Sequence, residues 1–432
     1  MLSTSLVIEN RKRLCAKLLP GSMAVFNSND VPPTNSDGTA SFYQNSDLYY
    51  LSGVKQEESI LLLCPDAPDP AWKEVLFLRE TTPFLETWEG KKLSKEAARQ
   101  LSGIKTVKWL AEFPTIFRQL MCEMENVYLN TNEHKRARIV VESRDARFVA
   151  ETKAQYPLHN YKRLAPIMHD LRIVKSPEEV AVMQSACDLT EKAFRRVLKF
   201  VKPGVNEAQI EAEFAHEFIC QRERFAYMPI IASGKNALGL HYIENNAVCR
   251  DGDLILIDVG GTRDLYNADM TRTIPVNGRF TKRQRQIYNS VLFVLRELIT
   301  QLQPGLIWSN WQQNACELIQ GELVKLGVLS TRDIRRQDPD NPAYRKYFMH
   351  GIGHPLGLDV HDVGFTTRPL PAGCVMTCEP GIYIPEEGVG VRLENNILLT
   401  DSGPVDLMAN IPLDPDEVEG IMQGKSSKKK KK

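Results

Sequence analysis

The first part of the chain alternates short apolar runs with longer stretches of mixed polarity. The apolar runs at residues 60–63, 75–78 and 127–129 have the length and composition of buried strands. The segments between them have the character of helices. Strands that alternate with helices predict an α/β domain, which we place at residues 1–171.

A strong helix signal follows this region. Ser176 is a good N-cap, Pro177 suits the first turn, and two glutamates come next. The domain boundary is therefore predicted just before this helix, near residue 172. The apolar positions of the helix keep roughly helical spacing: Val180, Val182, Met183, Ala186 and Leu189.

Two further helices are predicted, at residues 206–223 and 282–302, the second of them capped by Thr281. They alternate with strand-like runs such as 254–257. This order predicts an α+β domain over residues 172–423, with helices on one side of a curved antiparallel sheet.

Composition narrows the classes of function. The net charge is zero, and 43% hydrophobic with 25% charged residues is ordinary for a globular protein, so no nucleic-acid partner is indicated. We find neither a signal peptide nor a membrane-spanning run, and we expect a cytoplasmic protein without a membrane partner. The lysine-rich end, 424–432, is expected to be a disordered, solubilising tail. The nine scattered cysteines favour reduced thiols over a thiolate metal site.

One pair of acids lies in a predicted hairpin. Asp258 ends the apolar run 254–257, and Asp269 follows the polar stretch 260–267. If the two face each other in an antiparallel pair, the turn falls between Arg263 and Asp264. A carboxylate at the end of a buried strand is costly unless it is paired or binds a metal.

A second pair repeats the pattern. Glu379 and Glu394 would face each other if the turn falls between Glu386 and Glu387, within a Pro-x-x-Gly turn signal. Most acids are solvated surface residues, but like charges directly opposite each other destabilise a sheet unless a cation lies between them. Two such pairs predict a cation site.

Three of the eight histidines, His350, His354 and His361, lie within twelve residues. The stretch is rich in glycine, so a long helix is not expected there. A histidine in such a loop is most often only hydrogen-bonded, but the clustering favours a site. Four carboxylates with one imidazole, that of His354, form an oxygen-rich set that suits two divalent ions and hydrolytic chemistry.

Several motifs together resemble the pita-bread metallopeptidases, specifically the Xaa-Pro aminopeptidase (aminopeptidase P) group, with the prolidases close behind. In the second half these are LHYIENN, DGDLILIDVGG, NADMTRTIPVNG, FMHGIGHPLGLDVHDVG, CEPGIY and VRLENN. In the first half, FYQNSDLYYLSG and ETWEGKKL are similar to the amino-terminal domain of the long bacterial members, and DLRIVKSPEEVAVMQ to their interdomain segment. The short span between Glu379 and Glu394, and Pro355 after His354, depart from some members and leave the shape of the substrate pocket open.

The resemblance implies a pita-bread catalytic domain behind a creatinase/prolidase-like amino-terminal domain. It also implies two divalent ions, Mn²⁺ first with Co²⁺ or Zn²⁺ as alternatives, and a bridging hydroxide as nucleophile. Asp269 and Glu394 would bridge the ions, Asp258 would hold one, and His354 and Glu379 the other. The implied substrates are peptides with proline second, and the implied assembly is a homodimer or homotetramer.

The same resemblance implies roles for further residues. Glu379 would move a proton to the leaving nitrogen, while His361 and His241 would be catalytic groups that contact the substrate around the scissile bond. The remaining implied substrate-binding or orienting residues are His350 in the proline pocket, Tyr383, Arg392 and Trp88. For Tyr383 and Arg392 the alternatives are strand packing and a surface ion pair. For Trp88 the alternatives are a place in the core and the implied substrate-binding role, in which it reaches the cleft of a neighbouring subunit.

Other functions stay open. Prolidase shares the five ligands and cleaves only Xaa-Pro dipeptides, although the amino-terminal motifs favour the aminopeptidase. A catalytically inactive pita-bread scaffold and the metal-free creatinases are disfavoured because all five ligands are present together with His241 and His361. Methionine aminopeptidase is disfavoured because it lacks a long first domain.

Overall fold

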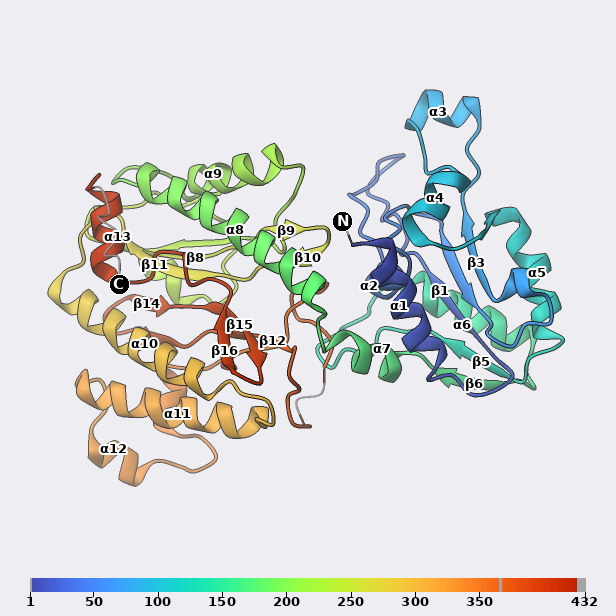
Figure 1. Ribbon diagram of the computed structural model, residues 1–432. Helices are drawn as coiled ribbons and strands as arrows, with labels where there is room; N and C mark the ends of the chain where they lie inside the picture. Colours follow the sequence, from blue (N-terminus) through green and yellow to red (C-terminus); the bar gives the residue numbers. More distant parts are fainter. Residues whose placement is uncertain (1, 365–366, 426–432) are drawn as a thin grey trace. The chain divides into compact units, whose positions relative to one another are not determined.

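A computed structural model describes residues 2–364 and 367–425. The chain divides into two compact units between Arg172 and Ile173 (Figure 1). The predicted lysine-rich tail lies almost wholly outside the described residues. No helix within the described ranges is long and apolar enough to cross a membrane. All nine cysteines lie in these ranges, and each is a free thiol.

The first unit is built on a six-stranded mixed sheet in the order β4-β3-β2-β1-β5-β6. The apolar runs predicted as strands are confirmed as the buried β2, β3 and β5. The strands are β1 (Ser22–Asn27), β2 (Ile60–Leu63), β3 (Glu74–Leu78), β4 (Thr106–Trp109), β5 (Asn126–Leu129) and β6 (Asn160–Arg163). The helices are α1 (Thr4–Cys15), α2 (Ser46–Ser52), η1 (Pro70–Trp72), α3 (Pro83–Glu89), α4 (Lys95–Ser102), η2 (Leu110–Glu112), α5 (Phe113–Met121), α6 (Arg144–Gln155) and α7 (Ala165–Arg172).

The second unit has antiparallel sheets packed against helices. Its strands are β7 (Ile230–Ser233), β8 (Leu254–Asp258), β9 (Thr262–Arg263), β10 (Tyr266–Asn267), β11 (Thr271–Pro275), β12 (Val375–Cys378), β13 (Gly381–Ile384), β14 (Val389–Arg392), β15 (Asn395–Thr400) and β16 (Gly403–Asp406). Its helices are α8 (Pro177–Phe200), α9 (Glu207–Cys220), η3 (Gly234–Leu238), α10 (Lys282–Gln301), α11 (Trp308–Lys325), α12 (Thr331–Arg336), η4 (Ala343–Lys346) and α13 (Pro415–Met422).

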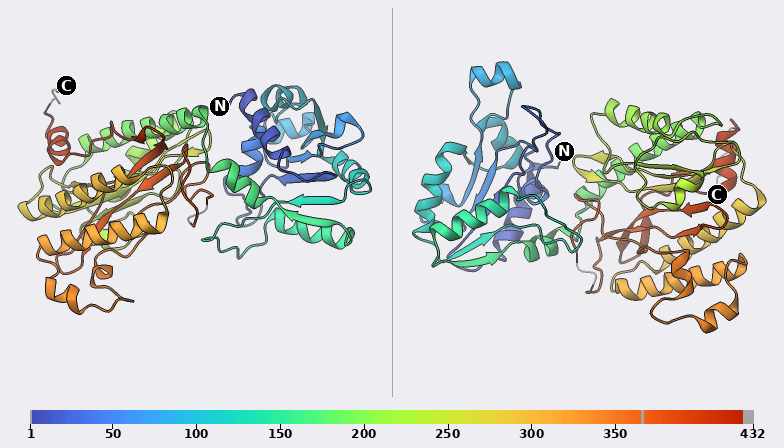
Figure 2. Two further views of the ribbon diagram at one scale, coloured as in Figure 1. Left: turned by 60° about the horizontal axis from the view of Figure 1, so that its bottom comes forward. Right: turned by 180° about the vertical axis from the view of Figure 1, so that it is seen from behind.

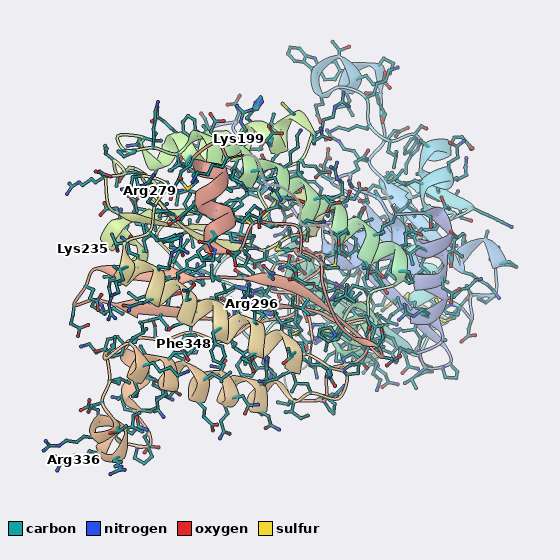
Figure 3. All side chains as sticks on the ribbon, turned by 60° about the vertical axis from the view of Figure 1, so that its left-hand side comes forward. Lys199, Lys235, Arg279, Arg296, Arg336 and Phe348 are labelled. Carbon is teal, nitrogen blue, oxygen red and sulfur yellow. The ribbon has the colours of Figure 1, made fainter. Side chains whose placement is uncertain are left out.

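The predicted helix starts are confirmed. Ser176 caps α8 in a capping box with Glu179, and Thr281 caps α10 in another with Gln284. In the second unit, α10 contacts β12, β13, β14, β16 and the neighbouring α11, while α8 contacts β9 and β10 (Figure 2). Charged side chains such as Lys199, Arg296 and Arg336 lie on the exposed sides of the helices (Figure 3).

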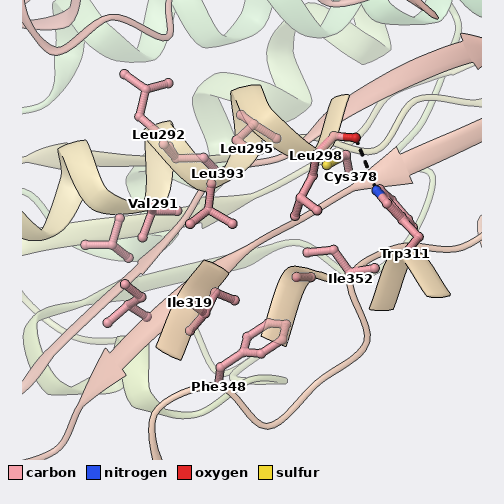
Figure 4. Packing of buried hydrophobic residues seen from close by; sticks show 14 of the residues in the cluster. Val291, Leu292, Leu295, Leu298, Trp311, Ile319, Phe348, Ile352, Cys378 and Leu393 are labelled. Atoms are coloured by element: carbon pink, nitrogen blue, oxygen red, sulfur yellow. Dashed lines mark hydrogen bonds between the residues drawn. The ribbon is translucent and has the colours of Figure 1, made fainter. Parts of the chain in front are cut away.

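The core between α10, α11 and the strands decides which face of the hairpin is polar. Val391 and Leu393 belong to this core, so Arg392 and Glu394, which alternate with them, point to the opposite face. The core is closed by Trp311, whose indole N–H donates to the Leu298 carbonyl at 3.1 Å (Figure 4). Because one face of the hairpin packs in the core, its acidic side chains lie on the opposite face.

The predicted register of the second hairpin is confirmed. Strand β12 pairs Cys378 with Asn395, and β13 pairs Gly381 with Arg392. The same register runs through both pairs of strands, so Glu379 lies opposite Glu394.

The predicted register of the first hairpin is wrong by two residues. Asp258 pairs with Thr271, not with Asp269. The turn lies at Asp264 and Leu265, both with positive φ (48° and 67°), as a tight two-residue hairpin turn requires. The turn comes one residue later than predicted. Moving a hairpin turn by one residue changes the partner of each strand residue by two positions, so Asp258 faces Thr271. Asp269 consequently keeps its face of the sheet but lies diagonally from Asp258.

Candidate metal centre

Three side chains form the heart of the site. Each offers one ligand atom, and these three atoms lie within 4.8 Å of one another; the residues are Asp269, His354 and Glu394, all buried. Glu379 adjoins them, with its Oε1 3.7 Å from His354 Nε2, which also lies 3.4 Å from Asp269 Oδ2. The β8–β11 hairpin thus contributes one carboxylate, the β12–β15 hairpin two, and the loop before β12 the imidazole.

The chain orients His354 through its neighbours. Its backbone pairs with Thr377, since Thr377 N–H donates to the His354 carbonyl at 2.9 Å. Its Nδ1 lies 3.0 Å from the Pro355 carbonyl, so Nδ1–H is the donor there and Nε2 faces Asp269 and Glu379. Burial opposes a charge on His354, but the two carboxylates outweigh burial and raise its pKa. This orientation would suit the imidazole as a ligand for a cation shared with these acids.

Asp258 joins the site through a tyrosine that the sequence interpretation missed. The Tyr227 hydroxyl lies 2.5 Å from Asp258 Oδ1 and 2.7 Å from Asp269 Oδ1. A hydroxyl carries one hydrogen, so it cannot donate fully to both carboxylates. Tyr227 precedes β7 by a few residues, and neither its spacing nor its neighbours distinguish it from a core tyrosine.

A chain of hydrogen bonds leads outward from Asp258. Arg392 donates from Nη2 to Asp258 Oδ2 at 2.5 Å and from Nη1 to the Tyr383 hydroxyl at 2.9 Å. That hydroxyl lies 2.9 Å from His350 Nε2. Arg392 and Tyr383 are both buried, so the alternative of a surface ion pair is wrong for Arg392. The structure joins four predicted site residues, Asp258 among them, in one network.

The carboxyl groups are difficult to ionise together. Burial raises the pKa of Glu379 to about 7, although His354 and Arg392 oppose the rise. Burial also raises the pKa of Asp258 and, with help from Asp269 and Glu379, holds the pKa of Glu394 well above its ordinary value. A divalent cation among them would stabilise the ionised forms. The donor set of oxygens and one nitrogen fits such an ion.

The other histidines differ in burial. Burial, with the nearby Arg392 guanidinium and the neighbouring His241, lowers the pKa of His350 to about 3, so its 3.9 Å contact with Glu379 is not an ion pair at neutral pH. His361 is exposed, and its ring meets that of His354 edge-on with centroids 4.4 Å apart. His241 is exposed in the loop after η3.

Trp88 lies in the first unit, on α3, and is 75% exposed. Its ring centroid is 6.2 Å from that of Phe84, which is 69% exposed. A place in the core, one of the alternatives for this residue, is therefore wrong. Trp88 thus belongs to the first unit, whereas the other predicted site residues belong to the second.

The family models match in two places. The model for metallopeptidase family M24 matches residues 181–401, and the model for the amino-terminal domain of aminopeptidase P matches residues 7–128. The first match covers the metal centre, and the second covers most of the first unit.

Individual relatives agree with the models. The chain is 35% identical to the Xaa-Pro aminopeptidase of Escherichia coli, over 95% of this chain and 96% of the relative. It is 33% identical to human Xaa-Pro aminopeptidase 3, over 91% and 78%. Zinc-substituted E. coli aminopeptidase P in complex with product matches with a TM-score of 0.86 and 33% identity, over 98% and 99% of the two chains. The chain therefore belongs to metallopeptidase family M24 and is a metal-dependent aminopeptidase of the aminopeptidase P type.

Proposed function

We propose that this aminopeptidase uses two metal ions to release the amino-terminal residue from peptides with proline in second position. The names of its relatives support the specificity: the E. coli and Haemophilus influenzae relatives are Xaa-Pro aminopeptidases. A similar E. coli structure contains the inhibitor Pro-Leu, a dipeptide that begins with proline (TM-score 0.86, 32% identity, 98% and 99% coverage).

The charge balance of the site is the observation that carries the dinuclear proposal. Asp258, Asp269, Glu379 and Glu394 lie together with Arg392 as the neighbouring guanidinium. If the four carboxyls ionise, three negative charges remain uncompensated. Two divalent ions together with one hydroxide carry three positive charges and bring the sum to zero. A single divalent ion would leave a buried negative charge, which is costly.

We assign the ligands as follows. Asp269 and Glu394 would be shared by the two ions, Asp258 would help to hold one of them, and His354 with Glu379 would help to hold the other. When bound, the ions supply an activated water and a Lewis acid for the scissile carbonyl. Mn²⁺ is our first candidate, with Co²⁺ and Zn²⁺ as alternatives, because carboxylate and imidazole ligands accept all three.

The residues of the chain move the proton and hold the substrate. Glu379 takes the proton of the attacking water and returns it to the prolyl nitrogen, which must be protonated to leave. His361, beside His354, and His241 stabilise the oxyanion and hold the peptide around the scissile bond. His350, kept neutral by burial and bonded to Tyr383, lines the pocket for the proline ring.

A peptide comparison tests the specificity. Purified protein loaded with Mn²⁺ is incubated with equimolar Gly-Pro, Arg-Pro-Pro and Arg-Ala-Pro, and released amino acids are followed. We expect rapid release of arginine from Arg-Pro-Pro and little cleavage of the other two, since proline's fixed φ and missing N–H distinguish it. Fast hydrolysis of Gly-Pro with an inert tripeptide would indicate prolidase. No cleavage and no bound metal after chelator-free purification would indicate a scaffold.

The proposal also covers the domain bounds, the assembly and the cellular compartment of the protein. We propose an amino-terminal domain at residues 1–171 and a catalytic domain at 172–423. We also propose a homodimer or homotetramer in which the exposed Trp88 contributes to substrate binding. The nine free thiols support a reducing compartment such as the cytoplasm. Mass photometry and mixed-variant assays with Trp88→Ala would test the assembly.

A further inference from the structure

A buried carboxylate outside the metal centre is surrounded by hydrogen-bond donors. Glu207, the first residue of α9, has no exposed surface. Its Oε1 accepts from Ser233 N–H and Oγ–H, both at 2.7 Å, and from Asn236 Nδ2 at 3.2 Å. Its Oε2 accepts from the Tyr242 hydroxyl at 2.7 Å and from Ala247 N–H at 2.9 Å. Five donors satisfy this carboxylate without a cation.

These donors come from the beginning, the middle and the end of one loop, residues 234–247. Ser233 ends β7 just before the loop, and Ala247 closes it. The backbone repeats the connection, because Glu207 N–H donates to the Ala247 carbonyl at 2.9 Å. The Asn206 side chain adds a bond of 2.9 Å to the Asn246 carbonyl. The amino-terminal end of α9 thus clamps both ends of the loop.

The loop carries His241, directly before the anchored Tyr242. Its first part packs closely on β14, where a Cβ at Gly390 would lie 2.4 Å from the Ala237 carbonyl oxygen. Strand β14 also carries Arg392 of the metal centre. The loop therefore lies against a strand of the site at one point and against Glu207 at another.

We propose that Glu207 is a positioning residue for catalysis: it holds the loop 234–247 so that His241 contacts the peptide at the metal centre. The proposal rests on the proposed function, in which His241 binds the substrate around the scissile bond. Glu207 touches neither the ions nor the substrate. It acts through Tyr242, which directly follows His241 in the chain and whose hydroxyl donates a hydrogen bond to Glu207.

The carboxylate is needed because donors surround both of its oxygens, so both atoms must be hydrogen-bond acceptors. In Glu207→Gln one oxygen becomes an NH₂ group. Whichever way the amide turns, a backbone N–H, that of Ser233 or Ala247, then faces a donor instead of an acceptor. The variant is nearly isosteric, so it loosens the loop without leaving a cavity. A buried donor without its acceptor costs stability locally, and the loop is the part free to respond.

The test compares three variants of the whole enzyme on Arg-Pro-Pro. We expect Glu207→Gln to lower kcat/KM roughly 10- to 100-fold, the scale of a displaced catalytic contact, with metal content unchanged. Tyr242→Phe, which removes one of the five bonds, should show a smaller loss in the same direction. The control is Glu213→Gln on the same helix, which loses only an ion pair with Arg196 and should match wild type.

Combining variants separates positioning from general destabilisation. In a His241→Ala background, Glu207→Gln should cost little more, because the residue that it positions is gone. The same loss in both backgrounds would overturn the proposal. Amide hydrogen exchange of residues 234–247 should quicken in Glu207→Gln, and unchanged exchange would also overturn it. If wild type cleaves no Xaa-Pro peptide, the proposed function itself fails, and the exchange result still reports whether Glu207 anchors the loop.

Discussion

Glu207 and Glu394 are two buried glutamates in the same unit, with 0% and 2% of their surface exposed. Glu207 accepts five hydrogen bonds, none of them from a residue of the candidate metal centre. Glu394 accepts from the Thr271 hydroxyl at 2.7 Å, and its pKa is raised first by burial and then by the neighbouring Asp269, Glu379 and Asp258.

The difference shows two ways to bury a carboxylate. Hydrogen-bond donors of the chain can stabilise the buried carboxylate, which then holds the surrounding segments in place. Where acids instead face one another with few donors, they stay ionised only if a cation from outside the chain binds among them, and otherwise they hold protons. In the proposed assignments, the number of donors around a buried acid separates the positioning residue Glu207 from the metal ligand Glu394.

Removing Glu394 gives the largest expected effect. Glu394→Ala should lose bound metal and lower turnover by more than about 100-fold, since even groups that only support metal ligands cost 10- to 100-fold. Metal per chain is measured by elemental analysis alongside turnover on Arg-Pro-Pro. The control is Glu386→Ala, an exposed acid at the turn of the same hairpin. Wild-type turnover of Glu394→Ala under metal-limited conditions would contradict the dinuclear site.

Tyr227→Phe should have an intermediate effect. It removes the hydroxyl that lies between Asp258 and Asp269, so these carboxylates lose a shared partner that orients them. We expect metal affinity to fall about 10- to 100-fold and kcat at saturating metal to change much less. A chelator competition titration measures this. Tyr288→Phe, which removes another buried hydroxyl, is the control, and equal affinity in both variants would contradict the role of Tyr227.

The smallest expected effect concerns a half-buried acid in the first unit, Asp145. Burial raises the pKa of Asp145 to about 7 despite a 2.9 Å hydrogen bond from Asn27. Between about pH 4 and pH 7 the unfolded chain is ionised at this position while the folded chain keeps its proton. Stability should therefore fall as pH rises through this window. Asp145→Asn has nearly the same shape as the protonated side chain and does not ionise, so it should remove the part of the stability loss that Asp145 causes as pH rises.

Hydrogen exchange of β1 and β5 in the whole protein, at matched pH values, measures the change. Asp66→Asn, at an exposed acid of the same unit, should leave the pH dependence as in wild type. An unchanged pH dependence in Asp145→Asn would show that this carboxyl is not the group responsible. Asp145 would then resemble the well-satisfied Glu207 more than the acids of the metal centre.

Local signals in the sequence predicted the elements well, because each depends on neighbours in the chain. Ser176 and Thr281 cap their helices through hydrogen bonds to the third residue onward. The second hairpin was predicted in register because its turn follows a Pro-x-x-Gly signal. The first was wrong because the polar stretch 260–267 allows several turns, and the observed one depends on the positive φ of Asp264 and Leu265.

The sequence by itself determined the family and predicted the two-part architecture and the acids and histidine of the candidate site, since all of these rest on local patterns and motif order. Only the tertiary structure decided that Tyr227 lies between two acids and that Glu207 holds the loop of His241. Those contacts join residues 26 to 42 positions apart through packed strands and loops. No local pattern encodes which distant donor meets a buried oxygen, because that pairing is settled when the whole unit packs.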